Sequence, residues 1–191
     1  MFNDRSSLAA YLATRRSARP RDLVAPGPDA ATLRAILAAA IRTPDHGKLH
    51  PWRLIHVPQE RRQAFAEMLE AAYRAGKPDA GRLEIEAAHR FAHQAPELVI
   101  LLMSPAESQK IPLWEQELSC GAVGMNLLHA AAAHGFAGGW VTGWATYSPQ
   151  VLQALGARRH ERIAGFFFLG TPGAELEERP RPDYEEIVST W

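Results

Sequence analysis

Apolar residues recur along this chain at two different spacings. Spacing of three and four residues, which predicts helices with a buried face, occurs at residues 7–15, 30–41, 60–73, 84–92 and 113–134. Short continuous apolar runs, which are typical of buried strands, occur at residues 54–57, 97–103, 140–144 and 163–169. Helices and strands interspersed in this way predict an α/β or α+β layered domain.

The longest helical segment, residues 113–134, is apolar nearly all round, so we expect it to be buried. Gly121 and Gly124 lie inside it, and each costs about 1 kcal/mol in helix propensity relative to alanine. We expect the close approach of another helix to offset that cost. No internal segment is an obvious partner, so the pattern favours the same helix of a second subunit in a two-fold homodimer.

A polar loop at residues 42–53 is held between a helix and a strand. Asp29 can cap the preceding helix, Pro44 stops that helix, and Pro58 ends the following strand. A polar, specialised loop between two buried elements suits a binding site. The alternative is a plain connection whose Trp52 fills the core, and the residue types alone leave both interpretations open.

Four arginines and a serine follow the first helix within seven positions, at Arg15, Arg16, Ser17, Arg19 and Arg21. Guanidinium groups at this density can hold a phosphate through bidentate, charge-assisted hydrogen bonds. Cations also gather at helix C-termini, where the helix dipole favours them. The spacing leaves that second interpretation open.

With 191 residues the chain is long enough for one domain with a full core. Lys plus Arg equals Asp plus Glu at 21 each, which argues against a nucleic-acid partner or an acidic membrane surface. No apolar run reaches the roughly 20 residues that span a bilayer. Cys120 is the only cysteine and residues 1–7 do not resemble a signal peptide, so we expect a protein of the reducing cytoplasm.

Metal and thiol chemistry find little support in the residue pattern. His46, His50 and His56 lie close in sequence, but their spacing in a loop is poor for a metal, and we expect none. Cys120 falls inside the predicted buried helix, where thiols are usually inert.

A bound flavin nucleotide suits the parts better. Gly138 and Gly139 follow a helix instead of opening one, so they are not a dinucleotide fingerprint. The arginine cluster can take a phosphate, and the polar loop can hydrogen-bond the edge of a ring. Aromatic faces are available at Trp52, Trp140 and Trp144.

Several motifs in this order resemble the nitroreductase family of flavoproteins. Arg15–Ser17 after the first helix, Pro44–His46 and the closing Pro51–Trp52 look like its two flavin-binding signatures. Residues 112–117, 135–140 and 165–172 resemble the compact YdjA-like subgroup. The similarity covers almost the full length of the chain.

The resemblance implies an α+β fold with three α/β/α layers, a mainly antiparallel sheet and an intertwined homodimer. Residues 1–191 would form one domain, with a helical lid at 59–95 and a C-terminal arm at 174–191 that reaches onto the partner subunit. FMN would bind at the dimer interface. The implied cofactor-binding residues are Arg15, Arg16, Ser17, Arg42, His46, Trp140, Val141, Thr142 and Arg181, with Arg179 as the second choice for the last position.

The implied activity is FMN-dependent oxidation of NADH or NADPH with ping-pong hydride transfer to a nitroaromatic or quinone-like acceptor, and with no essential protein acid or base. The alternatives are other flavin chemistry, such as reductive dehalogenation, and a flavin-binding sensor without turnover. Related sequences carry an arginine and a serine where this chain has Val141 and Thr142. A positive group beside the flavin ring is therefore missing here.

Overall fold

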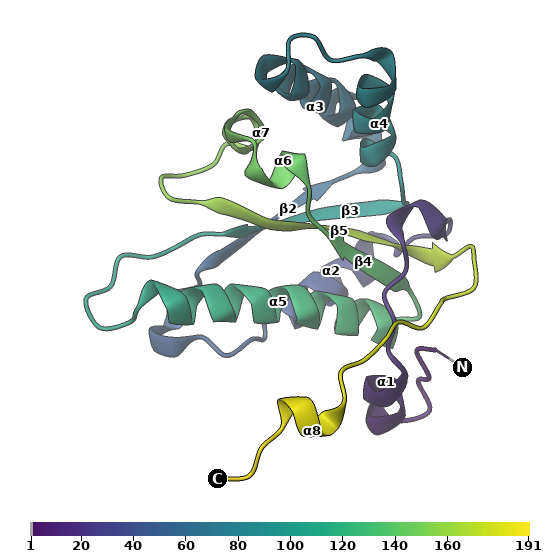
Figure 1. Cartoon of the computed structure of the whole chain (residues 1–191), viewed down its shortest axis with the longest axis vertical. Helices are drawn as coiled ribbons and strands as arrows, with labels where there is room; N and C mark the ends of the chain where they lie inside the picture. The colour runs from purple at the N-terminus through teal and green to yellow at the C-terminus, as the bar shows by residue number, and fades with distance from the viewer. Residues whose placement is uncertain (1) are drawn as a thin grey trace.

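The chain forms one antiparallel sheet with helices on both faces (Figure 1). The structure, a computed structural model, describes residues 2–191. The strands are β1 at Leu23–Val24, β2 at Trp52–Val57, β3 at Glu97–Met103, β4 at Ala137–Val141 and β5 at Arg162–Pro172. Their order is β1-β5-β3-β2, and β4 also pairs with β5. Every ladder is antiparallel, so the predicted α+β class is confirmed.

The helices form a layer above and a layer below the sheet in Figure 1. The upper layer holds α3 at Arg62–Gly76, α4 at Arg82–Ala92, α6 at Trp144–Tyr147 and α7 at Pro149–Ala154. The lower layer holds α2 at Ala30–Ala40 and α5 at Leu113–Ala133, with α1 at Leu8–Thr14 near one end of α5. The C-terminal arm carries α8 at Tyr184–Ile187 away from the sheet. Single 3-10 turns lie at Pro20–Asp22, His46–Lys48 and Gln59–Arg61.

Alternation of side chains along the central strands separates the core into two halves. On β3, Leu98 and Ile100 point to the upper layer, whereas Val99 and Leu101 point to the lower layer. The three successive phenylalanines of β5, residues 166–168, alternate in the same way. Because both strands are apolar on both faces, helices must cover the sheet on each side.

The sequence located most elements, with one error in type. The predicted cap at Asp29 is confirmed, since its carboxylate accepts from the backbone N–H of Thr32 at 2.8 Å. The Ser7 hydroxyl caps α1 by accepting from the N–H of Ala10 at 3.1 Å. The strand predicted at residues 140–144 is wrong beyond Val141, where pairing with β5 ends. The chain then turns, and Trp144 begins α6.

A buried arginine fixes the base of the α3–α4 hairpin. The guanidinium of Arg62 donates to the carbonyls of Val57 at 2.7 Å, Ala92 at 2.8 Å and Pro96 at 3.1 Å. Burial lowers the pKa of Arg62 to about 10, so the group still carries its charge at neutral pH. It joins the end of β2, the end of α4 and the start of β3.

The two glycines of α5 have different neighbours, which corrects the expectation that both face a partner helix. A Cβ at Gly124 would lie 2.8 Å from Cζ of Phe167 and 3.0 Å from the indole of Trp140, so this glycine admits the sheet of its own chain. A Cβ at Gly121 would meet nothing within 4 Å. The helix is also not buried all round, because Trp114 and Leu118 are 65% and 54% exposed.

Gly124→Ala should destabilise the protein. Overpacking against two buried aromatic rings costs about 1–3 kcal/mol, which exceeds the roughly 1 kcal/mol gained in helix propensity. Urea unfolding at several protein concentrations would measure the change, with Gly121→Ala as the matched control in the same helix. The loss at Gly124 should be present at every concentration, since its contacts are intrachain, and equal or greater stability of Gly124→Ala would contradict this packing.

Candidate functional site

The segment after α1 runs beside β4 and carries the first predicted site residues. Nη2 of Arg15 donates to Oγ of Ser17 at 3.2 Å. The N–H of Ala18 donates to the carbonyl of Gly138 at 3.0 Å, and a Cβ at Gly139 would lie only 2.6 Å from the carbonyl oxygen of Ala18. Because Gly138 and Gly139 lack side chains, this segment can approach the strand that continues into Trp140–Thr142.

Arg15 lies next to a pair that sequence reasoning missed. The hydroxyl of Tyr11 hydrogen-bonds with Nδ1 of His129 at 3.0 Å, and this contact joins α1 to α5. Burial raises the pKa of Tyr11 and lowers the pKa of His129, and the charge of Arg15 lowers the latter further. Arg15 has no ion-pair partner within residues 2–191, so its positive charge is uncompensated.

Arg16, although adjacent in sequence, contacts the C-terminal arm. Its Nε donates to the carbonyl of Glu177 at 2.6 Å and lies 3.7 Å from Oε1 of Glu178. Its backbone N–H donates to Oδ1 of Asn3 at 2.8 Å. The structure therefore does not bring the Arg16 side chain together with that of Arg15.

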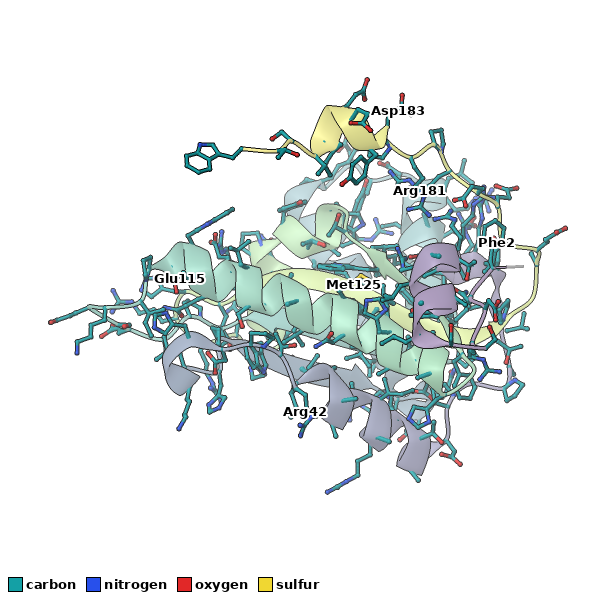
Figure 2. The ribbon with its side chains drawn as sticks, turned by 90° about the horizontal axis from the view of Figure 1, so that it is seen from below. Phe2, Arg42, Glu115, Met125, Arg181 and Asp183 are labelled. Atoms are coloured by element: carbon teal, nitrogen blue, oxygen red, sulfur yellow. The ribbon has the colours of Figure 1, made fainter. Side chains whose placement is uncertain are left out.

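The arm places Arg181 in the same neighbourhood (Figure 2). Nη2 of Arg181 donates to Oε1 of Glu178 at 3.1 Å, whereas Arg179 contacts that carboxylate only through its backbone N–H. This distinguishes the two candidate arginines. Arg16, Arg19 and Arg181 thus form a network of ion pairs with Glu177 and Glu178, whose net charge is +1, and Arg15 stands outside this network.

The polar loop before β2 has a fixed backbone. The Asp45 carboxylate accepts from the N–H groups of Leu49 at 3.2 Å and His50 at 2.9 Å. Gly47 has φ of +76° and packs against Ile111, so a side chain there would be strained and would clash. The backbone of this loop is therefore held by hydrogen bonds and by packing.

Two predicted residues of this loop, Arg42 and His46, lie apart from the Arg15 segment. His46 contacts Glu115 through its Nδ1 at 2.7 Å, near the start of α5. The Arg42 side chain is exposed, and Figure 2 shows it on the side of α5 opposite Arg181. From Glu115 to His129 the helix rises about 21 Å at 1.5 Å per residue. A single chain therefore separates His46 from the cluster around Arg15.

The tryptophans also differ in what they offer. The Trp140 indole Nε1 donates to the carbonyl of Ala164 at 3.0 Å, and the ring lies 5.0 Å from that of Phe167, so it is packed into the lower core. Val141 packs against the upper core, and Thr142 is exposed. Trp52 packs into the lower core as well.

Trp144 keeps an open aromatic face just after Thr142. It is 38% exposed, and the ring of Tyr73 in α3 meets it edge to face at 4.8 Å between centroids. The Tyr73 hydroxyl donates to Glu84 at 2.7 Å, which holds the ring in place. Nearby, a cavity of about 600 Å³ between α5, the start of β5 and the α6–α7 turn is lined in part by Trp140, Thr146 and Tyr147.

Two further features concern the chemistry available. Among residues 2–191 no group of three or more His, Cys, Asp or Glu side chains is placed to hold a metal ion. Burial raises the pKa of Cys120 to about 12, which makes it a poor nucleophile. Across the same described range, no helix has the length and apolar character needed to span a membrane.

Arg15→Ala should raise the pKa of His129, because removal of a nearby positive charge favours the imidazolium. The pKa should stay below the ordinary value of about 6.5, since burial is the larger cause of its depression. NMR titration of the histidine ring protons would measure both values. Arg21→Ala removes an exposed arginine and serves as the control, and an identical His129 titration in both variants would contradict the placement of Arg15.

Comparisons with known proteins identify the family and agree with the fold. The Nitroreductase family matches residues 12–171. The chain is 39% identical over 162 residues to the Escherichia coli (strain K12) protein named "Putative NAD(P)H nitroreductase YdjA", covering 84% of this chain and 86% of that protein. The structure of a nitroreductase-like family protein from Bacillus cereus superimposes with a TM-score of 0.80 at 22% identity, covering 97% and 96% of the two chains.

A variant of the FMN and NADPH-dependent nitroreductase NfnB, from Sphigopyxis sp. strain HMH, superimposes with a TM-score of 0.74 at 22% identity, covering 96% of this chain and 98% of that one. The family match spans most of the chain, and the curated relative is similar in sequence along most of its length. The chain belongs to the nitroreductase family.

Proposed function

We propose that this protein is an FMN-dependent oxidoreductase that takes electrons from NADH or NADPH and passes them to a nitroaromatic or quinone-like acceptor. The observation that carries the proposal is the guanidinium of Arg15, which has no ion-pair partner within residues 2–191 and donates to the Ser17 hydroxyl, a combination that suits a phosphate monoester. The relative named NAD(P)H nitroreductase and the neighbour named FMN and NADPH-dependent nitroreductase support it.

The residues of this chain would bind and orient the cofactor and leave the hydride chemistry to it. FMN, when bound, supplies hydride acceptance from the nicotinamide and hydride delivery to the acceptor. Arg15 and Arg181 would hold the phosphate, and the Ser17 hydroxyl would meet the ribityl chain. NAD(P)H and the acceptor would bind in turn, in ping-pong order.

We infer that the working unit is a homodimer. The exposed side of α5 presents Trp114, Leu118 and Met125 around the open position at Gly121, which is the surface expected of a helix that packs on a second copy. Figure 2 shows Met125 on this side. The arm, residues 174–191, exposes apolar side chains at Tyr184, Ile187, Val188 and Trp191 that would dock on the partner.

A dimer also unites the two groups of predicted site residues. His46 lies near the start of α5, and the Tyr11–His129 pair beside Arg15 lies near its end, so a two-fold arrangement can set the loop of one subunit against the arginine cluster of the other. In that arrangement Arg42 of the partner subunit would stabilise negative charge on the reduced ring. The site would be composite, with parts from both chains.

Trp144 is the best-placed side chain for an aromatic acceptor. It follows the exposed Thr142, and its face is open where Trp140 and Trp52 are packed. The lid expected at residues 59–95 stays a prediction. The helices α3 and α4 bury their apolar faces in the upper core, so the lid motion we propose is limited to the tip of the hairpin. A cytoplasmic location, which the single buried cysteine favours, also stays a prediction.

The purified protein, supplied with FMN, should show a flavin absorption spectrum that bleaches when NADPH or NADH is added without oxygen. Arg15→Ala should weaken FMN binding roughly ten- to a hundredfold through loss of a charge-assisted contact, with unchanged far-UV circular dichroism. Fluorescence titration of FMN would measure the change, and Arg21→Ala should bind as the wild type does.

The outcomes separate the proposed activity from its alternatives. Oxidation by nitro compounds or quinones after bleaching would support the proposal. Turnover of halogenated phenols alone would favour reductive dehalogenation, and flavin that neither nucleotide reduces would favour a binding or sensor protein. No FMN binding at any concentration would overturn the proposal altogether.

Leu118→Lys should convert the protein to a monomer and weaken FMN binding at the same time. Burial of an unpaired ammonium group at the subunit interface would destabilise the dimer, because the charge loses its hydration without gaining a partner. A site built from both chains would then lose the contacts that the second chain supplies. Sedimentation velocity would follow the subunit assembly. Leu83→Lys alters a leucine on α4 in the upper layer that is somewhat more exposed than Leu118, and a matching sedimentation profile for the two variants would argue against this interface.

A further inference from the structure

The two adjacent arginines of the Arg15–Ser17 motif have different partners. Arg15 donates to Ser17 and has no carboxylate partner within the described residues. The Arg16 side chain is only 17% exposed, and its Nε is occupied by the carbonyl of Glu177. A guanidinium group in such surroundings needs its hydrogen-bond acceptors, because desolvation without them is costly.

One carboxylate oxygen connects Arg16 to Arg181. Oε1 of Glu178 lies 3.7 Å from Nε of Arg16 and accepts from Nη2 of Arg181 at 3.1 Å. The backbone N–H of Arg179 donates to the same oxygen at 2.9 Å and fixes its position. The Arg181–Glu178 pair is itself about half exposed, so it places Arg181 only as well as the arm is held, and Arg16 holds the arm at Glu177 and Glu178.

The root of the arm has a second, independent attachment. Leu176 packs against the upper core, so the arm is tied to the domain by an apolar contact as well as by Arg16. Loss of Arg16 should therefore loosen residues 177–183 without detaching the arm or unfolding the domain. Arg19 forms an exposed ion pair with Glu177, and exposed pairs of this kind contribute little.

We propose that Arg16 is a positioning residue, which anchors the root of the C-terminal arm and through Glu178 sets Arg181 beside Arg15, and that it does not itself bind phosphate. This rests on the proposed function, in which the phosphate of FMN lies between Arg15 and Arg181. Arg16 acts on the cofactor only through the arm. The second arginine of the motif thereby couples cofactor binding to the segment that would reach the partner subunit.

A double-mutant cycle on FMN binding tests this assignment. Arg16→Gln and Arg181→Gln should each weaken FMN binding about tenfold, and the double variant should be no more than about twofold weaker than Arg181→Gln alone, because both changes remove one contact. Two independent phosphate ligands would instead give a loss of about a hundredfold in the double variant, which would overturn the proposal. Arg21→Gln, which alters an exposed arginine 3.9 Å from Asp22, is the matched control.

Backbone ¹⁵N relaxation without added FMN gives a readout that does not depend on the cofactor. The amides of residues 177–183 should have lower order parameters in Arg16→Gln than in the wild type, and wild-type values in Arg181→Gln and Arg21→Gln. Unchanged order parameters in Arg16→Gln would overturn the anchoring role even if FMN affinity fell. Failure of the wild type to bind FMN would reject the proposed function, whereas lower order parameters in Arg16→Gln would still support the anchor.

Discussion

The pairing of β3 with β5 is the constraint on which the rest of the structure depends. Both strands are apolar on both faces, so neither face of the sheet can meet water, and each needs its own layer of helices. The upper helices and the buried Arg62 close one face, while α2 and α5 close the other. Chemistry is thereby confined to the edges of the layers, where β4 ends and the flanking loops meet α5.

The helix α5 serves two surfaces at once, and that divides the site. Its inner side packs so closely on Trp140 and Phe167 that only glycine fits at position 124. Its outer side keeps apolar residues in contact with solvent and separates the arginine cluster from the loop that carries His46. The inner face of α5 completes the core of its own chain, whereas the apolar outer face lacks a partner within that chain. In the proposed dimer the second subunit covers this outer face and so becomes part of the binding site.

Local signals in the sequence were sufficient for the elements but not for the contacts between them. The cap at Asp29 and the apolar run of β3 depend on neighbours within a few residues, and the structure confirms both. The role of Gly124 depends on β4 and β5, and the partner of Arg16 lies 161 residues away, so no local pattern could reveal either. The apolar run at residues 140–144 predicts a strand that includes Trp144, but pairing of β4 with β5 ends at Val141, and the run alone does not show that end.

The distribution of charge explains how such a site could bind its cofactor firmly and still leave the ring accessible. Arg15 keeps a positive charge that no carboxylate pairs within residues 2–191, while at the end of β4 Val141 packs against the upper core and Thr142 is exposed. A cofactor held in this way is anchored by its phosphate, since Coulomb attraction falls with distance and is screened within about 10 Å. Stabilisation of charge on the ring must then come from outside this set, and in the proposed dimer Arg42 of the partner subunit supplies it. Reduction of the cofactor would depend on assembly of the two chains, whereas its retention would depend mainly on one.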